Sequence, residues 1–177
     1  MAAHVYETLV EAGQDLELTN VGMHAMNSLR IEKAYRHWGH DIADEDTPIE
    51  AGLEFAVRFD KPGGFIGREA LLKQKERGLV AKRMVQFLME DPEVMLYHND
   101  PIIRDGTICG YITSGMYGHT LGGSVGMGYL NNPLERSAVD SEFVNSGSYE
   151  IEVACKRYPA QASLEPLYDP GNERIKS

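Results

Sequence analysis

Three segments within the first 78 residues have the sequence pattern of helices. Residues 5–10 place apolar side chains on one helix face, and Gly13 follows where a left-handed C-terminal residue is expected. Residues 22–35 interleave methionine, leucine and isoleucine with polar side chains, which predicts a second, amphipathic helix. Residues 68–77 are rich in strong helix formers and precede Gly78, so they predict a third helix that ends at a glycine.

Between the second and third helices the pattern predicts a loop followed by a strand. Residues 40–48 are polar and acidic and end in proline, as is typical of a surface loop. Residues 55–59 alternate large apolar side chains with others, and the sequence Lys-Pro-Gly-Gly at residues 61–64 would end a strand. We therefore expect one strand in this part of the chain.

After about residue 80, short alternating segments separated by Gly, Asn, Asp and Pro replace the helical spacing. The pair Asp105-Gly106 lies between apolar flanks and is a strong hairpin signal. The change of pattern predicts a domain boundary, with one domain at residues 1–78 and an all-β domain at residues 81–168. Strands are expected at residues 85–89, on both sides of the Asp-Gly turn, and at residues 109–114, 124–130, 149–155 and 161–164.

The charge balance narrows the class of partner. Acidic residues outnumber basic ones by 27 to 17, and the formal net charge is −10. This excess argues against nucleic acid or an anionic membrane as the main partner and favours a small organic ligand or another protein.

No apolar run approaches the ~20 residues that span a bilayer, and residues 1–7 lack the features of a secretory signal, so we expect a soluble, cytoplasmic protein. Cys109 and Cys155 form no Cys-x-x-Cys pair, which favours reduced core thiols over a disulfide or a metal site.

Two polar clusters invite a chemical interpretation that their context does not support. The glycine-rich residues 118–123 lack the Gly-Lys-Ser/Thr ending of a phosphate loop and lead into no helical pattern, so turns and close backbone packing explain them better. His37, His40 and Asp41 could suggest metal ligands, but the residues that follow would break a helix holding them in register. His119 has no paired nucleophile or orienting acid in the sequence. We therefore expect neither a metal site nor a hydrolase triad.

Glu32 is the most informative polar residue, because it lies at the edge of an otherwise apolar helix. A surface salt bridge with Arg36, four residues further on, would explain it by spacing alone. A role in binding a ligand is the alternative, and the spacing does not decide between the two.

Four motifs, in order, resemble those of one family. The first is NSLRIEKAYRHWG at residues 27–39. It is followed by TPIEAGLE at residues 47–54, KPGGFIGREAL at 61–71, and TSGMYGHTLG at 113–122 with SVGMGY at 124–129. Together they resemble the carboxy-terminal part of the glycine-cleavage T-protein (aminomethyltransferase) family, most closely its folate domains in dimethylglycine and sarcosine dehydrogenases. The resemblance covers nearly the whole chain and is weakest after about Asn131.

The resemblance implies an α+β protein in which the tail of a folate-binding domain precedes an antiparallel β-barrel of six or seven strands. It also implies a tetrahydrofolate site in which Glu32 holds the pterin. A carboxylate only accepts hydrogen bonds, so it can take two parallel ones from the N–H edge of that ring. The family's basic residue further along the chain falls at Lys61 or at Arg68, where a cation would suit the carboxylates of the folate tail.

Three residues near the glutamate, namely His24, Tyr35 and Trp38, could offer a flat surface to the pterin, and packing is the alternative role for each. The implied reaction transfers a one-carbon unit from a methylated amine to tetrahydrofolate. The family's catalytic aspartate lies in an earlier part of the fold that residues 1–20 do not match, so we expect a fragment, a separate subunit or a truncated product with no catalytic residue of its own.

Any FAD would belong to a fused or partner oxidoreductase domain or subunit. A eukaryotic source would place the protein in the mitochondrial matrix instead of the cytoplasm. Two other functions remain open from the sequence. One is a non-catalytic β-barrel module that packs on another subunit, and the other is a folate-dependent demethylase of the same fold.

Overall fold

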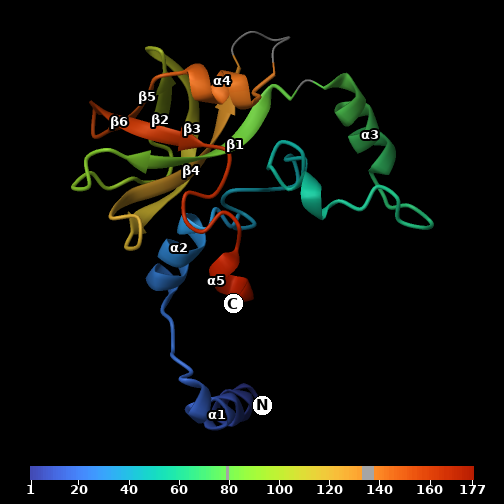
Figure 1. The fold of residues 1–177 in the computed structure, drawn as a ribbon, viewed down its shortest axis with the longest axis vertical. Coiled ribbons are helices and arrows are strands. Elements are labelled where there is room, and N and C mark those ends of the chain that lie inside the picture. The colour runs from blue at the N-terminus through green and yellow to red at the C-terminus, as the bar shows by residue number, and fades with distance from the viewer. Residues whose placement is uncertain (79, 133–137) are drawn as a thin grey trace.

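Six antiparallel strands close into a barrel in the order β1-β4-β3-β2-β5-β6 (Figure 1). The computed structural model describes residues 1–78, 80–132 and 138–177. The prediction of an α+β chain with an antiparallel barrel is therefore confirmed, with six strands in the described residues. The strands are β1 (Lys82–Met89), β2 (Pro101–Arg104), β3 (Thr107–Gly118), β4 (Gly123–Asn131), β5 (Tyr149–Val153) and β6 (Lys156–Ser163).

Strand β1 is buried on both faces, because a helix packs on its outer face. Val85, Phe87 and Met89 point into the barrel core, as the alternating pattern predicts. On the opposite face, Met84 packs in a second apolar cluster with Ile31 of helix α2 (Met23–Glu32). Helix α2 therefore lies against the barrel wall, beside strands β3 and β4 (Figure 1).

The three predicted helices are present, and two of their ends differ from expectation. Helix α1 is Ala2–Ala12, and Gly13 has a φ of −93°, so it is not the left-handed residue that we expected. Helix α2 ends at Glu32 and not near Tyr35, because Ala34 has a φ of 54°. Helix α3 has the predicted bounds, and Gly78 after it has a φ of 63°. The further helices are α4 (Ser141–Ser146), α5 (Glu173–Lys176) and the 3-10 turns Gln14–Leu16 and Glu54–Ala56.

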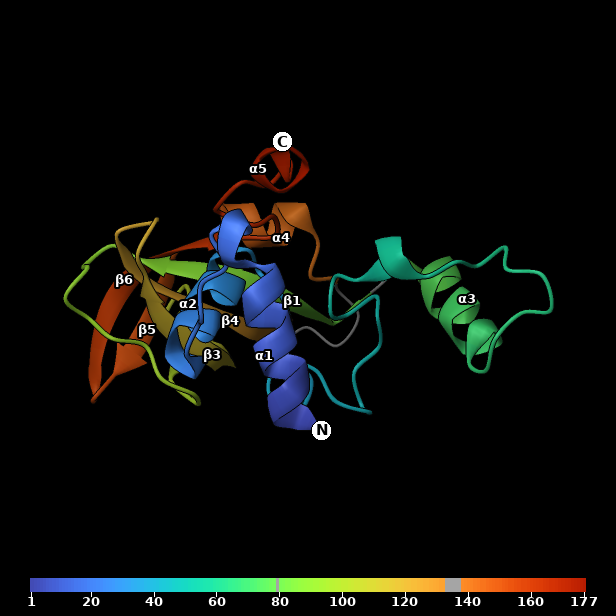
Figure 2. The same ribbon diagram turned by 90° about the horizontal axis from the view of Figure 1, so that it is seen from below.

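The predicted strand at residues 55–59 is wrong. Its start belongs to the 3-10 turn Glu54–Ala56, and the side chain of Phe55 is 85% exposed. The segment lies on the arm that carries helix α3 (Arg68–Arg77) away from the barrel (Figures 1 and 2). A strand needs a neighbour for its backbone N–H and C=O groups, and no described strand pairs with this arm.

Two hairpins turn through pairs of residues with positive φ. Asp105 and Gly106 form the predicted turn between β2 and β3, with φ values of 50° and 83°. Ala154 and Cys155 form an equivalent turn between β5 and β6, with φ values of 50° and 63°. Both cysteines are free, but only Cys109 is a core thiol, because Cys155 is exposed in this turn. Burial raises the pKa of the Cys109 thiol to about 11.

The β5–β6 turn offers a stabilising substitution. Replacing Ala154-Cys155 with Asn-Gly should relieve the left-handed backbone, because these residues adopt positive φ more readily. We expect a gain of about 1 kcal/mol, which corresponds to a melting temperature roughly 2–4 °C higher for a chain of this size. Thermal unfolding followed by circular dichroism measures the change. An unchanged or lower melting temperature would show that this turn carries no such strain.

Candidate functional site

The end of helix α2 is fixed against the barrel, and this positions Glu32. Its side chain is 1% exposed, although glutamate is seldom buried. The buried amide of Gln86 on β1 donates to the carbonyl oxygens of Ile31 at 2.6 Å and Glu32 at 3.2 Å. Carbonyls in the last turn of a helix have no partner within the helix, so Gln86 supplies one.

The carboxylate of Glu32 is held by the turn between β3 and β4. Its Oε1 accepts hydrogen bonds from the backbone N–H groups of Thr120 at 2.7 Å and Leu121 at 3.0 Å. A Cβ on Gly118 would lie 3.0 Å from the same oxygen and 3.0 Å from Cγ1 of Val125, so a side chain there would crowd the contact. The glycine-rich residues 118–123 thus form a turn, as predicted, and its amides bind an internal carboxylate.

The interpretation of Glu32 as half of a salt bridge with Arg36 is wrong. Arg36 lies beyond the end of the helix, where helical spacing no longer applies. Its Nε donates to the carbonyl oxygen of Ala51 at 2.9 Å, and its Nη1 donates to that of Ala34. Glu32 and Arg36 therefore use different partners.

Glu32 also borders a cavity of about 550 Å³. Its second oxygen, Oε2, accepts no hydrogen bond from the described residues. The carboxylate thus has one anchored oxygen and one oxygen without a hydrogen bond from the described residues, and Glu32 lines a cavity of a size that suits a small ligand. The other lining residues are Val21, Met26, Leu29, Arg30, Lys33, Tyr35, Thr120, Tyr168, Asp169, Arg174 and Ile175.

The C-terminal segment closes one side of this cavity. The N–H of Leu167 donates to Oε1 of Gln86 at 2.7 Å, and Nζ of Lys33 lies 3.2 Å from Oδ2 of Asp169. Desolvation pushes the pKa of Asp169 upward, but hydrogen bonds from Lys33 and from backbone N–H groups outweigh it and lower that pKa. The contact therefore stabilises the fold above the ordinary pKa of aspartate, and this contribution is lost as the pH falls through the lowered value.

A buried polar network joins helix α2 to the barrel. Asp41 is 1% exposed, and its Oδ2 accepts from Nη1 of Arg30 at 2.6 Å and from the N–H of His37 at 2.8 Å. Its Oδ1 accepts from the hydroxyl of Thr113 on β3, and Nη2 of Arg30 donates to the Ser114 hydroxyl at 2.8 Å. Both oxygens of Asp41 are therefore engaged in hydrogen bonds that hold the fold together. Separately, no group of three or more side chains that could hold a metal ion occurs within the described residues.

Two family models match this chain. The model of the glycine cleavage T-protein C-terminal barrel domain matches residues 82–169, and that of the GCVT N-terminal domain matches residues 1–61. The chain belongs to the glycine-cleavage T-protein family. The resemblance inferred from the four motifs is thereby confirmed.

Curated relatives of this T-protein family chain include oxidases and dehydrogenases. The chain is 43% identical over 99% of its length to 4-methylaminobutanoate oxidase (formaldehyde-forming) of Paenarthrobacter nicotinovorans, and covers 20% of that protein. It is 39% identical over 97% of its length to human mitochondrial sarcosine dehydrogenase, and covers 18% of it. It is 40% identical over 94% of its length to the mouse mitochondrial pyruvate dehydrogenase phosphatase regulatory subunit, and covers 20% of it. The chain thus spans about a fifth of the length of these relatives.

A solved structure of the family has the same fold. The glycine cleavage system aminomethyltransferase T from Bartonella henselae superposes with a TM-score of 0.75 at 25% identity. The match covers 96% of this chain and 44% of the solved chain. Within the described residues of the T-protein family chain, no helix combines the length and the apolar character needed to cross a membrane.

The structure brings one of the three predicted flat side chains to the cavity of Glu32. Tyr35, 51% exposed, lines that cavity and also a neighbouring one. His24 is exposed in the first turn of α2, and Trp38 is 66% exposed beyond the helix, where it bridges to Ile42. Neither of the latter lines the cavity of Glu32.

The two predicted cations lie on the arm that carries α3. Lys61 is exposed and lines a separate cavity of about 590 Å³ on that arm. Arg68 is half-buried, and its Nε donates to the carbonyl oxygen of Phe59 at 2.7 Å. The arm and helix α2 lie at different places around the barrel (Figures 1 and 2). Neither cation lines the cavity of Glu32 in this T-protein family chain.

Sequence reasoning missed the residues that complete the cavity from a distance. Thr120 and Leu121 contribute backbone N–H groups, which no side-chain motif reveals. Tyr168, Asp169 and Arg174 come from the C-terminal segment, where the motif resemblance was weakest. The sequence singled out Glu32, but it gave no sign that this residue meets the glycine-rich residues 118–123.

Proposed function

We propose that this chain is the tetrahydrofolate-recognition part of a longer protein that transfers a one-carbon unit from a methylated amine to tetrahydrofolate. The observation that carries the proposal is the buried carboxylate of Glu32 in the wall of a cavity, with Oε1 anchored and Oε2 without a hydrogen bond from the described residues. Family membership and the names of the oxidase and dehydrogenase relatives support the same reaction class.

The carboxylate suits the N–H edge of a pterin, because a carboxylate accepts hydrogen bonds and donates none. Since Oε1 already accepts two backbone hydrogen bonds, Oε2 is the oxygen that would meet the pterin N–H groups first. Bound tetrahydrofolate would supply the nucleophilic nitrogens that take up the one-carbon unit. The role of Glu32 is then to orient the ring, with Tyr35 at the cavity rim, so that those nitrogens meet the incoming carbon.

The remaining chemistry of the proposed reaction would come from other parts of the longer protein. A general acid or base would come from outside this chain, which spans about a fifth of its relatives. An FAD-dependent oxidoreductase domain or subunit would supply the oxidised methylamine. Lys61 and Arg68 stay proposed contacts for the folate carboxylates, and they require that the arm with α3 be brought toward Glu32 in the longer protein.

The variant Glu32→Gln tests the proposal. Glutamine keeps an oxygen that can accept from Thr120 and Leu121, and it places an N–H donor where the second carboxylate oxygen was. We expect the affinity for tetrahydrofolate to fall at least tenfold, on the order of 1.4 kcal/mol, in isothermal titration calorimetry.

The matched control is Glu165→Gln, which removes an exposed carboxylate that lines the neighbouring cavity. Its affinity for tetrahydrofolate should equal that of the unmodified protein. The titrations are made on this chain, where we expect weak binding, and on the longer protein that contains it. Equal affinities of Glu32→Gln and the unmodified protein would remove Glu32 from the site.

A non-catalytic interaction module is the second candidate function. The regulatory-subunit name of one relative favours it, as do the exposed apolar side chains on the free faces of two helices. Helix α1 buries none of its residues, and Met23, Met26 and Leu29 of α2 are 68%, 45% and 56% exposed. In this case the longer protein would bind no tetrahydrofolate, whereas the first proposal requires that it does.

A further inference from the structure

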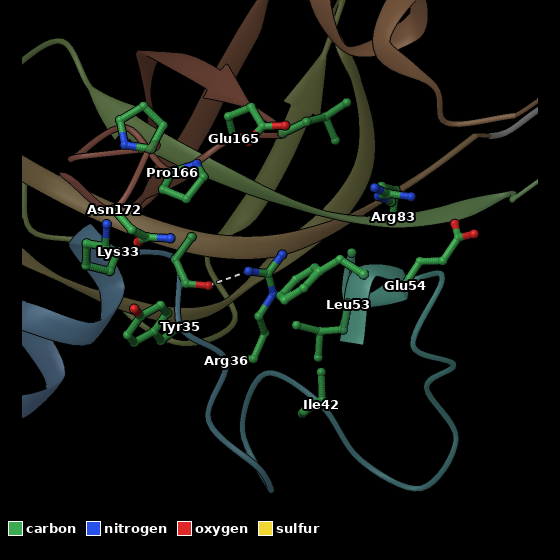
Figure 3. Close-up of a pocket in the computed structure, with 15 residues that line it drawn as sticks. Lys33, Tyr35, Arg36, Ile42, Leu53, Glu54, Arg83, Glu165, Pro166 and Asn172 are labelled. Carbon is green, nitrogen blue, oxygen red and sulfur yellow. Dashed lines mark hydrogen bonds between the residues drawn. The ribbon is translucent and has the colours of Figure 1, made fainter. Parts of the chain in front are cut away.

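The cavity that neighbours the one at Glu32 has a volume of about 650 Å³ and lies beside the end of helix α2 (Figure 3). Its walls come from residues 33–36, from the turn at residues 52–55 and from residues 164–172 of the C-terminal segment. Two arginines from different elements reach it. Arg36 follows helix α2, and Arg83 lies on strand β1.

Gly52 leaves room for both guanidinium groups beside it. A Cβ at this position would lie 2.8 Å from Nη2 of Arg36 and 3.7 Å from both Nε and Nη2 of Arg83. Gly52 also has a φ of 69°, which glycine adopts without strain. Both cations therefore border the same small volume beside the cavity.

Backbone carbonyls hold the arginines in place without neutralising them. Arg36 donates to the carbonyl oxygens of Ala34 and Ala51, and Nη1 of Arg83 donates to that of Ile49 at 3.2 Å. Nη2 of each arginine donates to no described residue, and Nε of Arg83 is enclosed without a partner. Among the residues that the structure describes, no carboxylate forms an ion pair with either guanidinium.

Two like charges placed together and partly desolvated are costly unless an anion joins them. Burial has the largest effect and lowers the pKa of Arg36; Asp41 and Tyr129 act in the opposite direction, Arg83 lowers this pKa further, and Glu165 raises it. The whole chain carries a net charge of −10, so two arginines that form no ion pair with a described residue stand out against their surroundings. Paired guanidinium groups with free Nη donors match the geometry of a carboxylate.

We propose that this cavity binds the carboxylate of a small organic acid between Arg36 and Arg83. The apolar side chains of Ile42, Leu53 and Phe55 line the same cavity and would contact the body of the ligand. The cavity volume lies in the range of small-molecule sites. Glu54 and Glu165 also line it, which disfavours a dianion such as a phosphate and favours a single negative charge. The cavity shares Lys33 and Tyr35 with the one that contains Glu32, but Glu32 itself does not line it.

Benzoate is a suitable probe, because it combines one carboxylate with a flat apolar body. Benzamide has the same shape without the charge. We expect benzoate to bind the unmodified chain in isothermal titration calorimetry at least tenfold more tightly than benzamide. In NMR spectra, benzoate should shift the Nε–Hε signals of Arg36 and Arg83, which tests the site without any substitution.

The variant Arg83→Gln should lower benzoate affinity at least tenfold, whereas Arg58→Gln should leave it unchanged, because the side chain of Arg58 is 75% exposed on the arm. Circular dichroism checks that both variants fold. Glu32→Gln should not affect benzoate binding, so this proposal and the folate proposal can fail independently. Equal binding of benzoate and benzamide, or benzoate shifts at arginines other than Arg36 and Arg83, would overturn the carboxylate site.

Discussion

Replacing Gly118 with alanine is expected to displace the carboxylate of Glu32 from the β3–β4 turn. The new Cβ would lie 3.0 Å from Oε1 and 3.3 Å from Cγ of Glu32, closer than ordinary van der Waals contact. On its other side the Cβ would meet Val125, which is 0% exposed and cannot move away. We expect a loss of about 1–3 kcal/mol in the free energy of unfolding. Tetrahydrofolate affinity should fall at least as far as in Glu32→Gln.

Two measurements separate this effect from a general loss of stability. The backbone N–H signals of Thr120 and Leu121 should shift strongly in NMR spectra of Gly118→Ala, because they lose the carboxylate acceptor. In the control Gly171→Ala the added methyl group would lie no closer than 3.5 Å to any neighbouring atom, which is an ordinary van der Waals contact. This variant should leave both signals in place. In a Glu32→Ala background, Gly118→Ala should cost less than in the unmodified chain. Additive costs would contradict the proposed contact.

Local signals were sufficient where the chain's own residues decide the backbone. The bounds of α3 follow from strong helix formers and the left-handed Gly78, and the first hairpin follows from Asp105-Gly106. The second hairpin carries no such signal, because Ala154 and Cys155 do not favour positive φ. There the pairing of β5 with β6 imposes the turn, and this pairing is a property of the barrel.

Tertiary contacts also explain the failures of the helical and strand predictions. The amphipathic pattern of α2 continues to Tyr35, but the helix ends earlier because Ala34 has a left-handed backbone. The side-chain amide of Gln86 then donates hydrogen bonds to the last carbonyls of the helix. Alternation at residues 55–59 predicted a strand, yet alternation describes only side chains and cannot supply a neighbouring strand. In the first case the partner, Gln86, lies more than 50 residues away in the sequence, and in the second no described strand provides a partner.

The candidate site divides in the same way. The position of Glu32 in a predicted amphipathic helix drew attention to this residue, and the family resemblance implied a role for it. Its partners in the structure are backbone groups 88 and 89 residues further on, and Lys33 meets Asp169 across 136 residues. Spacing rules act over one or two helical turns, so they cannot find such contacts. They also favoured the incorrect pairing of Glu32 with Arg36.

Removing the carboxylate of Asp41 is expected to have the largest effect on stability. In Asp41→Ala the guanidinium of Arg30, whose side chain is 14% exposed, loses its ion pair, and the Thr113 hydroxyl loses one of its two acceptors. The N–H of His37 loses its acceptor as well. Leaving one partner of a buried ion pair uncompensated costs about 3–5 kcal/mol. Urea denaturation followed by circular dichroism measures this loss in the free energy of unfolding.

The exposed pair of Arg58 and Asp60 provides the control, because its side chains are 75% and 81% exposed and its charges are 3.4 Å apart. Asp60→Ala should change the free energy of unfolding by about 0–1 kcal/mol. A similarly small change in Asp41→Ala would show that the network does not hold α2 on the barrel. If the network does hold it, Asp41→Ala should also weaken tetrahydrofolate binding without contacting the ligand, because the same helix positions Glu32 over the β3–β4 turn.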